Sequence, residues 1–560
     1  MKHQGRKYEV ELDPTSTGEV FKFQVYSLTG VEPERQKILV KGGQIKNDTD
    51  LSRLGVKPGE TFMMMGTPSA DGSKNVIRPK EKIRFLEDMT EAEQASQAGA
   101  TPAGLQNLGN TCYLNSTLQA LRSVPELQQE LSKYNPGPGS LLGPLSDLGG
   151  SPVGLDLIAC LRDLYRQMNQ TQEGFPPLLF LNALRHKFPQ FAERLKTGPG
   201  FAQQDAEEAW SQILSELRQN LKIKVDGAEG LNASNEISFV DKYMAGNFFS
   251  IVECDEQAAK DAGEAPTQTV DQFFKLDCHI SGTTNHLREG ILAALEEKIE
   301  KRSEVLDRSA VYTKRSKIAR LPKYLTVHFV RFYWKKEAKK KSKIMRKVSF
   351  PNELDVVEFC TDELKEMLIP VRDKVREIRK DIDEVERSRK RQKNIQEKAV
   401  ADKAAAAAEQ FSGSKDPTKA TGSGSTSTDA EMVDISHKTD AEVDPERTAS
   451  ILAAKKELQA LINPKLAKDD GVNSSGLYEL RGVVTHQGAS ANSGHYTAYV
   501  KKQGPLDPVA GKRGAEDEKW WWFNDDKVSE VDSEKIQSLS GGGEFHSALI
   551  LLYRAIPLPI

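Results

Sequence analysis

The segment 104–121 constrains the fold of this chain more than any other part of its sequence. It opens with the turn-forming run GLQNLGNT, and Cys112 follows directly. Leucines then recur with the spacing of one helix face, at Leu114, Leu118 and Leu121. We therefore expect Cys112 at or near the N-terminus of a helix. The partial positive charge at that end favours the thiolate, which is the nucleophilic form of cysteine.

A nucleophilic cysteine needs a base, and the base must come from elsewhere in the chain. Without one, a cysteine at a helix start is most often a small buried apolar residue. Two later segments offer the missing groups. The segment 482–500 reads GVVTHQGASANSGHYTAYV and contains His495, and the segment 522–528 reads WFNDDKV and contains Asn524 and Asp525.

These three segments resemble the cysteine box, the histidine box and the histidine-orienting box of the ubiquitin-specific proteases. The resemblance implies that Cys112 is the nucleophile and His495 the general base and acid. It also implies that Asn107, together with the backbone N–H of Cys112, holds the oxyanion. The family usually has Asp where this chain has Asn524. Because an Asn can also hold the imidazole tautomer, the relative roles of Asn524 and Asp525 in orienting the histidine stay open.

A fourth segment, 201–214, has helical apolar spacing and resembles the second box of the same family. The resemblance implies that Gln204 and Asp205 support the substrate cleft, and that Gly494 and Tyr496, on either side of the catalytic histidine, also contact substrate. Taken without the resemblance, the segment is better interpreted as a surface amphipathic helix with acidic residues.

Residues 1–66 are predicted to form a separate unit. The stretches 8–12 and 21–25 both alternate in the manner of strands. The stretch 28–65 looks like the second half of a ubiquitin-like domain, a small β-grasp fold. That resemblance implies that 19–29 is the single helix of the domain, against the strand that alternation predicts there.

One strand of this unit is unaccounted for. If 8–12 is the second strand, nothing remains to supply the first, because 1–7 is short and polar. The first strand normally lies between two others, so its loss would leave two unpaired edges. We therefore expect the unit to lack its first strand and the chain to begin inside the domain.

The remainder of the chain is predicted to be a linker over 67–100 and a catalytic domain over 101–560. Helical patterns dominate its first part, near 154–168 and 178–187, and strand patterns follow at 237–240, 247–252 and 324–332. The fold class is therefore α+β. The resemblance implies a papain-like thumb and palm with a β-rich fingers region, preceded by the small ubiquitin-like domain.

Many members of the family hold a zinc ion in the fingers through paired C-x-x-C motifs. This chain has only Cys254 and Cys278 in that region, and neither belongs to a C-x-x-C motif. A structural zinc site needs four well-placed ligands. We therefore predict no zinc and no other cofactor.

A charged segment and a low-complexity segment follow. Residues 363–400 are predicted to form a helix that pairs with 441–462 as a hairpin. Between them, five consecutive alanines and a run rich in Ser, Gly and Thr cannot bury enough apolar surface to order themselves. This predicts a disordered insert at about 401–445. The C-terminal stretch 540–553 is predicted to close the domain with a buried strand.

Two loops are expected beside the cleft. The loop 486–494 is small and polar and leads into His495, and the basic run 334–343 follows a strand and is expected to be mobile. The chain resembles the proteasome-associated subfamily of the ubiquitin-specific proteases in four features. These are the ubiquitin-like start, the absence of zinc ligands, the THQG sequence at the first loop and the GGG sequence near the end. The resemblance implies that such loops cover the cleft until the proteasome displaces them. The alternative for 486–494 is a plain hairpin connection between two strands.

The composition of the chain limits the kinds of binding partner and the cellular compartment that we expect for it. The net charge of −3, with both signs abundant, argues against bulk nucleic-acid binding. No apolar run reaches the ~18 residues of a membrane span, and the first residues contain no apolar signal core. Five cysteines without framework spacing fit a reducing compartment. The resemblance implies the cytoplasm and the nucleus.

The implied reaction is hydrolysis of the bond after the C-terminal glycine of ubiquitin, on substrates bound to the proteasome. The implied partners are ubiquitin, ubiquitinated proteins and the regulatory particle of the 26S proteasome, reached through residues 1–66. Two alternatives stay open. The chain is a protease for another ubiquitin-like modifier, or it is a ubiquitin-binding regulator of the proteasome with little catalysis.

Overall fold

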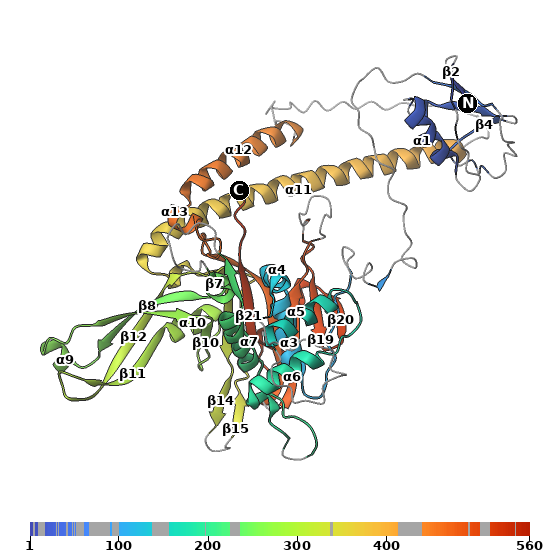
Figure 1. Ribbon diagram of the computed structural model, residues 1–560. Helices are drawn as coiled ribbons and strands as arrows, with labels where there is room; N and C mark the ends of the chain where they lie inside the picture. The colour runs from blue at the N-terminus through green and yellow to red at the C-terminus, as the bar shows by residue number, and fades with distance from the viewer. Residues whose placement is uncertain are drawn as a thin grey trace, which may run out of the picture. The chain divides into compact units, whose positions relative to one another are not determined.

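Figure 1 shows the computed structural model of the chain. It describes residues 1–3, 6–8, 10, 17–29, 31, 33–40, 43–47, 49, 51, 61–66, 90–91, 100–136, 156–195, 198–224, 236–335, 340–412, 440–490, 493–504, 514, 516–543 and 545–560. At 27, 334–335, 340–341, 392–412 and 440–446 it describes only the backbone. The chain divides into two compact units, Met1–Glu87 and Asp88–Ile560. The predicted linker 67–100 falls outside the described residues, except for Thr90, Glu91 and Ala100.

The first unit is a five-stranded sheet that packs against one helix. Its strands are β1 (Lys2–His3), β2 (Arg6–Lys7), β3 (Lys37–Val40), β4 (Gly43–Gln44) and β5 (Met63–Met65), and its helices are α1 (Gly18–Thr29) and the 3-10 turn η1 (Pro33–Arg35). The strand order is β2-β1-β5-β3-β4, with β1 parallel to β5 and the other pairs antiparallel. This is the β-grasp arrangement that the sequence predicted.

The helix of this unit overrides the local alternation of apolar residues. Phe21 and Val25, four residues apart, are buried in the core with Ile38 and Met64, whereas Phe23 between them is 46% exposed. Residues four apart share one helix face. The helix expected over 19–29 is therefore confirmed, and the strand suggested by 21–25 alone is wrong.

The expectation that the unit lacks its first strand is wrong. Strand β1 lies between β2 and β5, and its Lys2 is opposite Met63 of β5. The second strand is Arg6–Lys7, earlier than the predicted 8–12, and the backbone N–H of Tyr8 donates to the carbonyl of Met1 at 2.8 Å. Because β1 is only two polar residues long, it shows no alternation in the sequence, and only its pairing with β2 and β5 reveals it.

In the second unit, helices gather in residues 100–224, which we call the helical half. They are α3 (Cys112–Arg122), α4 (Pro125–Lys133), α5 (Leu157–Met168), α6 (Leu178–Lys187), η4 (Pro189–Ala192) and α7 (Ala206–Asn220). Buried leucines of α3, α5 and α6 and Trp210 of α7 form one core. Sheet residues such as Tyr496 and Leu552 belong to the same core, so the helical half packs against one face of the main sheet.

The main sheet has eight strands, in the order β10-β13-β21-β17-β18-β19-β20 with β16 also paired to β17. They are β10 (Leu276–His279), β13 (Tyr324–Val330), β16 (Glu353–Asp355), β17 (Leu477–Ser490), β18 (Ser493–Lys501), β19 (Trp520–Asn524), β20 (Lys527–Val531) and β21 (Ser547–Ala555). Its other face is covered by α10 (Leu287–Leu295), η5 (Val357–Phe359), α14 (Ser533–Gln537) and η6 (Ser538–Ser540) in a second core. The predicted C-terminal strand is β21, and it is buried.

A four-stranded antiparallel sheet extends away from the main sheet (green, at the left of Figure 1). Its order is β11-β12-β8-β9, from β8 (Gly246–Cys254), β9 (Thr267–Phe273), β11 (Glu296–Ser303) and β12 (Arg308–Arg320), with α9 (Gln257–Asp261) near its end. This sheet is the expected fingers region. Just before it, the strand predicted at 237–240 is wrong in its second half. β7 (Glu236–Ser238), paired with β6 (Lys222–Lys224), gives way to α8 (Phe239–Tyr243), because the Ser238 hydroxyl caps a helix.

Two long helices form the predicted hairpin. α11 (Asp362–Ser412) and α12 (Asp440–Leu461) pack together, with Val375 and Leu458 in a small core and Lys374 Nζ 2.6 Å from Glu457. A short α13 (Pro464–Ala467) follows. The disordered insert predicted at about 401–445 is wrong at both ends, where 401–412 and 440–445 are helical, and 413–439 lies outside the described residues. Alanine has the highest helix propensity, which outweighs its small apolar surface here.

The basic run 334–343, expected as a mobile loop, is instead mostly a β-hairpin. β14 (Phe332–Lys335) pairs with β15 (Lys340–Lys343), and the tip 336–339 lies outside the described residues. The loop after His486 is likewise mostly extended strand, with Gln487 opposite His495. Within the described residues no helix is long and apolar enough to cross a membrane.

Candidate active site

Cys112 is the first residue of α3, as the sequence predicted. The preceding turn is held by Asn107, whose Oδ1 accepts from the backbone N–H groups of Gly109 at 3.0 Å and Thr111 at 3.2 Å. Gly109 and Asn110 have positive φ values of 94° and 54°. Glycine and asparagine adopt this conformation more readily than other residues. The Gly- and Asn-rich composition of the segment therefore builds the turn that presents the thiol at the helix N-terminus.

The Cys112 thiol is buried, with 3% of the residue exposed. Burial raises the pKa of the thiol to about 11, and the negative charge of Asp525 adds to this effect, while a hydrogen bond with the Tyr496 backbone lowers it. The unliganded site therefore favours a neutral thiol. Attack on a carbonyl then requires that the proton move to a neighbouring base.

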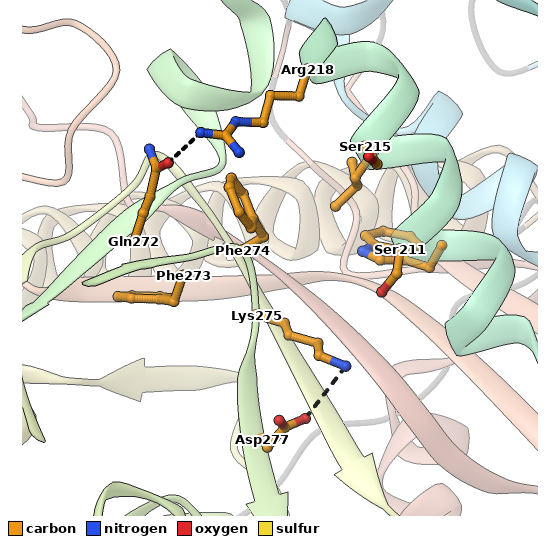
Figure 2. Close-up of a pocket in the computed structure, with 10 residues that line it drawn as sticks. Ser211, Ser215, Arg218, Gln272, Phe273, Phe274, Lys275 and Asp277 are labelled. Carbon is orange, nitrogen blue, oxygen red and sulfur yellow. Dashed lines mark hydrogen bonds and ion pairs between the residues drawn. The ribbon is translucent and has the colours of Figure 1, made fainter. Parts of the chain in front are cut away.

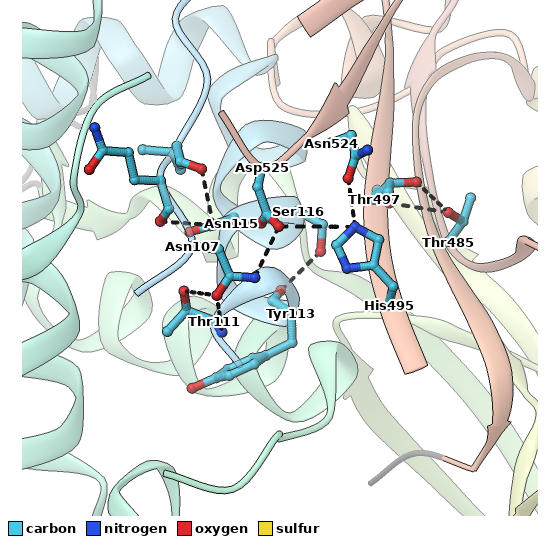
Figure 3. Close-up of polar contacts among 12 residues, drawn as sticks. Asn107, Thr111, Tyr113, Asn115, Ser116, Thr485, His495, Thr497, Asn524 and Asp525 are labelled. Carbon is cyan, nitrogen blue, oxygen red and sulfur yellow. Dashed lines mark hydrogen bonds and ion pairs between the residues drawn. The ribbon is translucent and has the colours of Figure 1, made fainter. Parts of the chain in front are cut away.

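His495 lies on β18, and its Nε2 is 2.6 Å from Asn524 Oδ1 at the end of β19 (Figure 3). A carboxamide oxygen only accepts, so this contact assigns the ring proton to Nε2 and leaves Nδ1 free to accept a proton. No hydrogen bond joins Cys112 to His495 among the described residues. Catalytic hydrogen bonds are often long in unliganded enzymes and shorten when substrate binds.

Asp525 lies further from the imidazole than Asn524 does. Its Oδ2 is 4.0 Å from His495 Nε2, and it accepts from Asn107 Nδ2 at 3.0 Å, while its Oδ1 accepts from Asn115 Nδ2 at 2.8 Å (Figure 3). An added Cβ at Gly104 would lie 2.7 Å from the Asp525 carbonyl oxygen. Glycine at position 104 therefore allows the turn after β19 to approach the backbone of the cysteine segment.

The residues expected to contact substrate gather around this centre. The Asp205 side chain caps α7 by accepting from Glu207 N at 3.0 Å, and Gln204 precedes it. Tyr496 is buried, with its ring 4.6 Å from that of His486. Gly494 has φ +124°, and a Cβ there would lie 2.0 Å from the Gln487 carbonyl, so only glycine fits.

Sequence reasoning did not single out two histidines of this site, His486 and His546. Burial, with the charge of Lys343, lowers the pKa of His486 to about 3, and burial, with the charge of His495, lowers that of His546 to about 4. The His546 ring centroid is 6.3 Å from that of His495. Asn115 was also passed over. Its place in the cysteine segment, three residues after Cys112, was the available signal.

A pocket of about 380 Å³ opens further along α7, between that helix and the chain that joins β9 to β10 (Figure 2). Arg218 of α7 donates to Gln272 Oε1 at 2.7 Å, and its guanidinium lies 4.8 Å from the Phe274 ring centroid. Lys275 lies 3.8 Å from Asp277 and also contacts Glu207, at the start of α7. The pocket therefore lies where the helical half meets the strand-rich half.

No group of three or more His, Cys, Asp or Glu side chains suited to a metal ion occurs in the described part of the chain. Cys254 belongs to a small core of the fingers, and Cys278 is buried beside Gly290 in the core behind the main sheet. The two cysteines predicted not to bind zinc thus lie in different cores.

A buried thiol at a helix N-terminus, beside a strand whose histidine is hydrogen-bonded to an amide, defines a cysteine hydrolase of the papain type. The sequence profile named ubiquitin carboxyl-terminal hydrolase matches residues 103–553, and that of the ubiquitin family matches 1–69. The chain belongs to the ubiquitin carboxyl-terminal hydrolase family, the cysteine-type deubiquitinases, with an N-terminal ubiquitin-like domain.

Similar proteins span nearly the same length. Ubiquitin carboxyl-terminal hydrolase 6 of Schizosaccharomyces pombe is 42% identical, over 99% of this chain and 97% of its own. Ubiquitin carboxyl-terminal hydrolase 6 of Arabidopsis thaliana is 38% identical, over 98% of this chain and 96% of its own length. Ubiquitin carboxyl-terminal hydrolase 14 of Caenorhabditis elegans is 30% identical, over 99% of this chain and 92% of its own length. A solved SAGA DUB module bound to ubiquitin aldehyde aligns with a TM-score of 0.44 at 16% identity, over 84% of this chain and 71% of that one.

Proposed function

We propose that the chain hydrolyses the bond after the C-terminal glycine of ubiquitin with Cys112 as nucleophile and His495 as base and acid. The observation that carries this proposal is the 2.6 Å contact between His495 Nε2 and Asn524 Oδ1, because it leaves Nδ1 as the proton acceptor. Cys112 passes its proton to His495, and the thiolate attacks the glycine carbonyl. The protonated histidine then gives its proton to the departing amine, and water releases the thioester.

Asn107 and the backbone N–H of Cys112 are proposed to hold the oxyanion. One amide N–H of Asn107 is bonded to Asp525, and the second remains for a ligand. The C-terminal tail of ubiquitin would reach the thiol between Tyr496 of the main sheet and the start of α7, with Gln204, Asp205 and Gly494 around it. Loss of one oxyanion donor typically costs about 10²–10³ in rate.

The test uses the full chain and a ubiquitin whose C-terminus carries an electrophile. We expect one covalent adduct per chain, lost in Cys112→Ala, which should still bind ubiquitin while hydrolysis falls to background. Turnover of Cys112→Ala within tenfold of wild type would remove Cys112 from its role. A probe built on another ubiquitin-like modifier tests the first alternative, and a faster adduct with that probe would reassign the substrate.

We also propose that the enzyme acts on substrates at the proteasome, to which residues 1–66 bind, and that it works in the cytoplasm and the nucleus. Support comes from the β-grasp unit, which is compact by itself, and from the resemblance to the proteasome-associated subfamily. The β14–β15 hairpin contacts His486, through Lys343 and Phe332, and the segment that starts at His486 leads into His495, which fits a cleft that opens on binding.

Removal of residues 1–66 should weaken co-purification with the proteasome and leave cleavage of a free ubiquitin reporter unchanged. Added proteasome should raise reporter cleavage by the full chain, because a partner that prefers an open cleft increases the competent population. Equal proteasome binding with and without these residues would refute the docking role. A regulator with little catalysis would show neither a covalent adduct nor stimulated cleavage.

A further inference from the structure

Asp525 accepts hydrogen bonds from three residues of the cysteine segment, two of them through its carboxylate (Figure 3). Its Oδ2 accepts from Asn107 in the turn before the nucleophile, at 3.0 Å, and its Oδ1 accepts from Asn115 on α3, at 2.8 Å. Its own backbone carbonyl accepts from Leu105 N at 2.9 Å. Because Asp525 directly follows Asn524, these contacts also fix the residue that holds the catalytic histidine.

The backbone of Asp525 has an uncommon conformation that needs external support. Its φ is +54°, in the left-handed region that non-glycine residues rarely adopt, within the two-residue turn between Asn524 and Lys527. Such conformations persist where surrounding contacts hold them. The two amide donors and the backbone bond to Leu105 provide those contacts.

Asn115 supports Asp525 from within α3. It lies three residues after Cys112 on the same helix, with 2% of its surface exposed. Besides Asp525, its Nδ2 lies 3.2 Å from the carbonyl oxygens of Leu105 and Gln106. One amide thus joins α3, the cysteine segment and the turn after β19.

We propose that Asn115 is a positioning residue for hydrolysis, which clamps Asp525 between itself and Asn107. The clamp fixes the positions of the Asn524–His495 pair and of the Asn107 amide relative to the Cys112 thiol. This role of Asn115 rests on the functions proposed above for those residues. A neutral amide suits this position, because it leaves the negative charge of Asp525 intact 4.0 Å from His495 Nε2. That charge stabilises the imidazolium that forms when Cys112 gives up its proton.

The experiment measures steady-state hydrolysis of a ubiquitin C-terminal reporter by the full chain. For Asn115→Ala we expect kcat to fall about 10- to 100-fold, as for loss of a hydrogen bond to a charged group, with KM within about twofold. The matched control is Gln119→Ala. Gln119 is another buried amide of α3, 2% exposed, whose Nε2 donates to the Ala103 carbonyl at 2.9 Å. Gln119 does not reach Asp525, so the kcat of Gln119→Ala should stay within about threefold of wild type.

A double-mutant cycle separates positioning from a general loss of structure. In an Asp525→Ala background, Asn115→Ala should cause no further fall in kcat, because both changes open the same clamp, whereas the effect of Gln119→Ala should add. Additive losses for Asn115 and Asp525, or a rise in KM that accounts for the loss in kcat/KM, would overturn the proposal.

If Asn115→Ala does not fold, Asp525→Asn tests the clamp from the other side. It keeps the shape of the side chain but turns one acceptor into a donor, so only one of the two amides can bond to it, and kcat should again fall at unchanged KM. Full turnover of Asp525→Asn, or of a folded Asn115→Ala, overturns the clamp. Turnover by Cys112→Ala would instead overturn the proposed nucleophile, so the two failures are distinguishable.

Discussion

Asn524 and Asp525 are adjacent in the chain but lie at different distances from His495. Asn524 Oδ1 is 2.6 Å from His495 Nε2, and the nearest Asp525 oxygen is 4.0 Å away. An amide can orient the ring but carries no charge to stabilise an imidazolium, whereas a carboxylate at 4.0 Å can. We infer that Asn524 orients the histidine and Asp525 supplies the charge.

Substitution of Asn524 tests this division. Asn524→Ala removes the only acceptor within hydrogen-bond distance of His495 among the described residues, and the tautomer is then no longer fixed. We expect kcat to fall by about 10² or more. Asn524→Asp keeps the acceptor, and kcat should stay within about tenfold of wild type. The reporter assay measures both variants. Should Asn524→Ala retain most of its turnover, Asp525 would be the orienting residue.

Among the connecting elements, the β14–β15 hairpin is fixed to the main sheet by two buried cations. Arg331, at its base, donates to the carbonyl oxygens of Ala548 at 2.8 Å, Arg346 at 2.8 Å and Ser540 at 3.1 Å. Lys343, on β15, donates to the His486 carbonyl at 2.6 Å. Burial, with the nearby charge of Arg331, lowers the pKa of Lys343 to about 7.

The lowered pKa means that the buried ammonium opposes folding. The folded chain binds this proton less tightly than the unfolded chain, whose lysine titrates near 10.5, so stability from this site rises as pH increases from about 7 to 10.5 and is least below pH 7. A group that costs stability next to a catalytic site is consistent with a functional role of the hairpin.

Lys343→Met keeps the length of the side chain and removes the charge. We expect the melting temperature of the catalytic unit to rise by about 1–4 °C at pH 6.5, because the cost of desolvating the ammonium is gone. The increase in melting temperature between pH 7 and 10 should also be smaller in the variant than in wild type. Lys347→Met, at an exposed lysine of the segment after the hairpin, is the control and should change neither quantity. A lower melting temperature for Lys343→Met at pH 6.5 would show that the hydrogen bond outweighs desolvation.

The chain divides into two compact units with separate cores, and the three relatives named above each align with 98% or more of its length. Since the core of the first unit lies within residues 21–64, its removal should leave the buried residues of the catalytic unit unchanged. If the truncated chain loses proteasome binding but keeps reporter cleavage, the result supports a docking role for residues 1–66. If it loses both, the truncation has damaged the catalytic unit.

Much of the geometry of the candidate site could be predicted from the sequence, because its parts lie in short segments with strong local patterns. The turn before Cys112 needs glycine and asparagine at positive φ, and the helix after it needs leucines at helical spacing. The family resemblance supplied His495 and Asn524. The ubiquitin-like helix was also predicted, although local alternation favoured a strand and only burial of one face decided against it.

Other features depended on contacts between distant segments. Strand β1 is two polar residues, and only its pairing with β2 and β5 makes it a strand. The basic run 334–343 forms a hairpin because Arg331 and Lys343 find carbonyl oxygens more than a hundred residues away in the chain.

The sequence by itself therefore determined which residues are proposed to carry the chemistry, since catalysis requires particular side chains in particular local turns. Only the tertiary structure decided how Asn524 and Asp525 divide their contacts, because hydrogen bonds to His495, Asn107 and Asn115 depend on distances between segments separated by up to 418 residues.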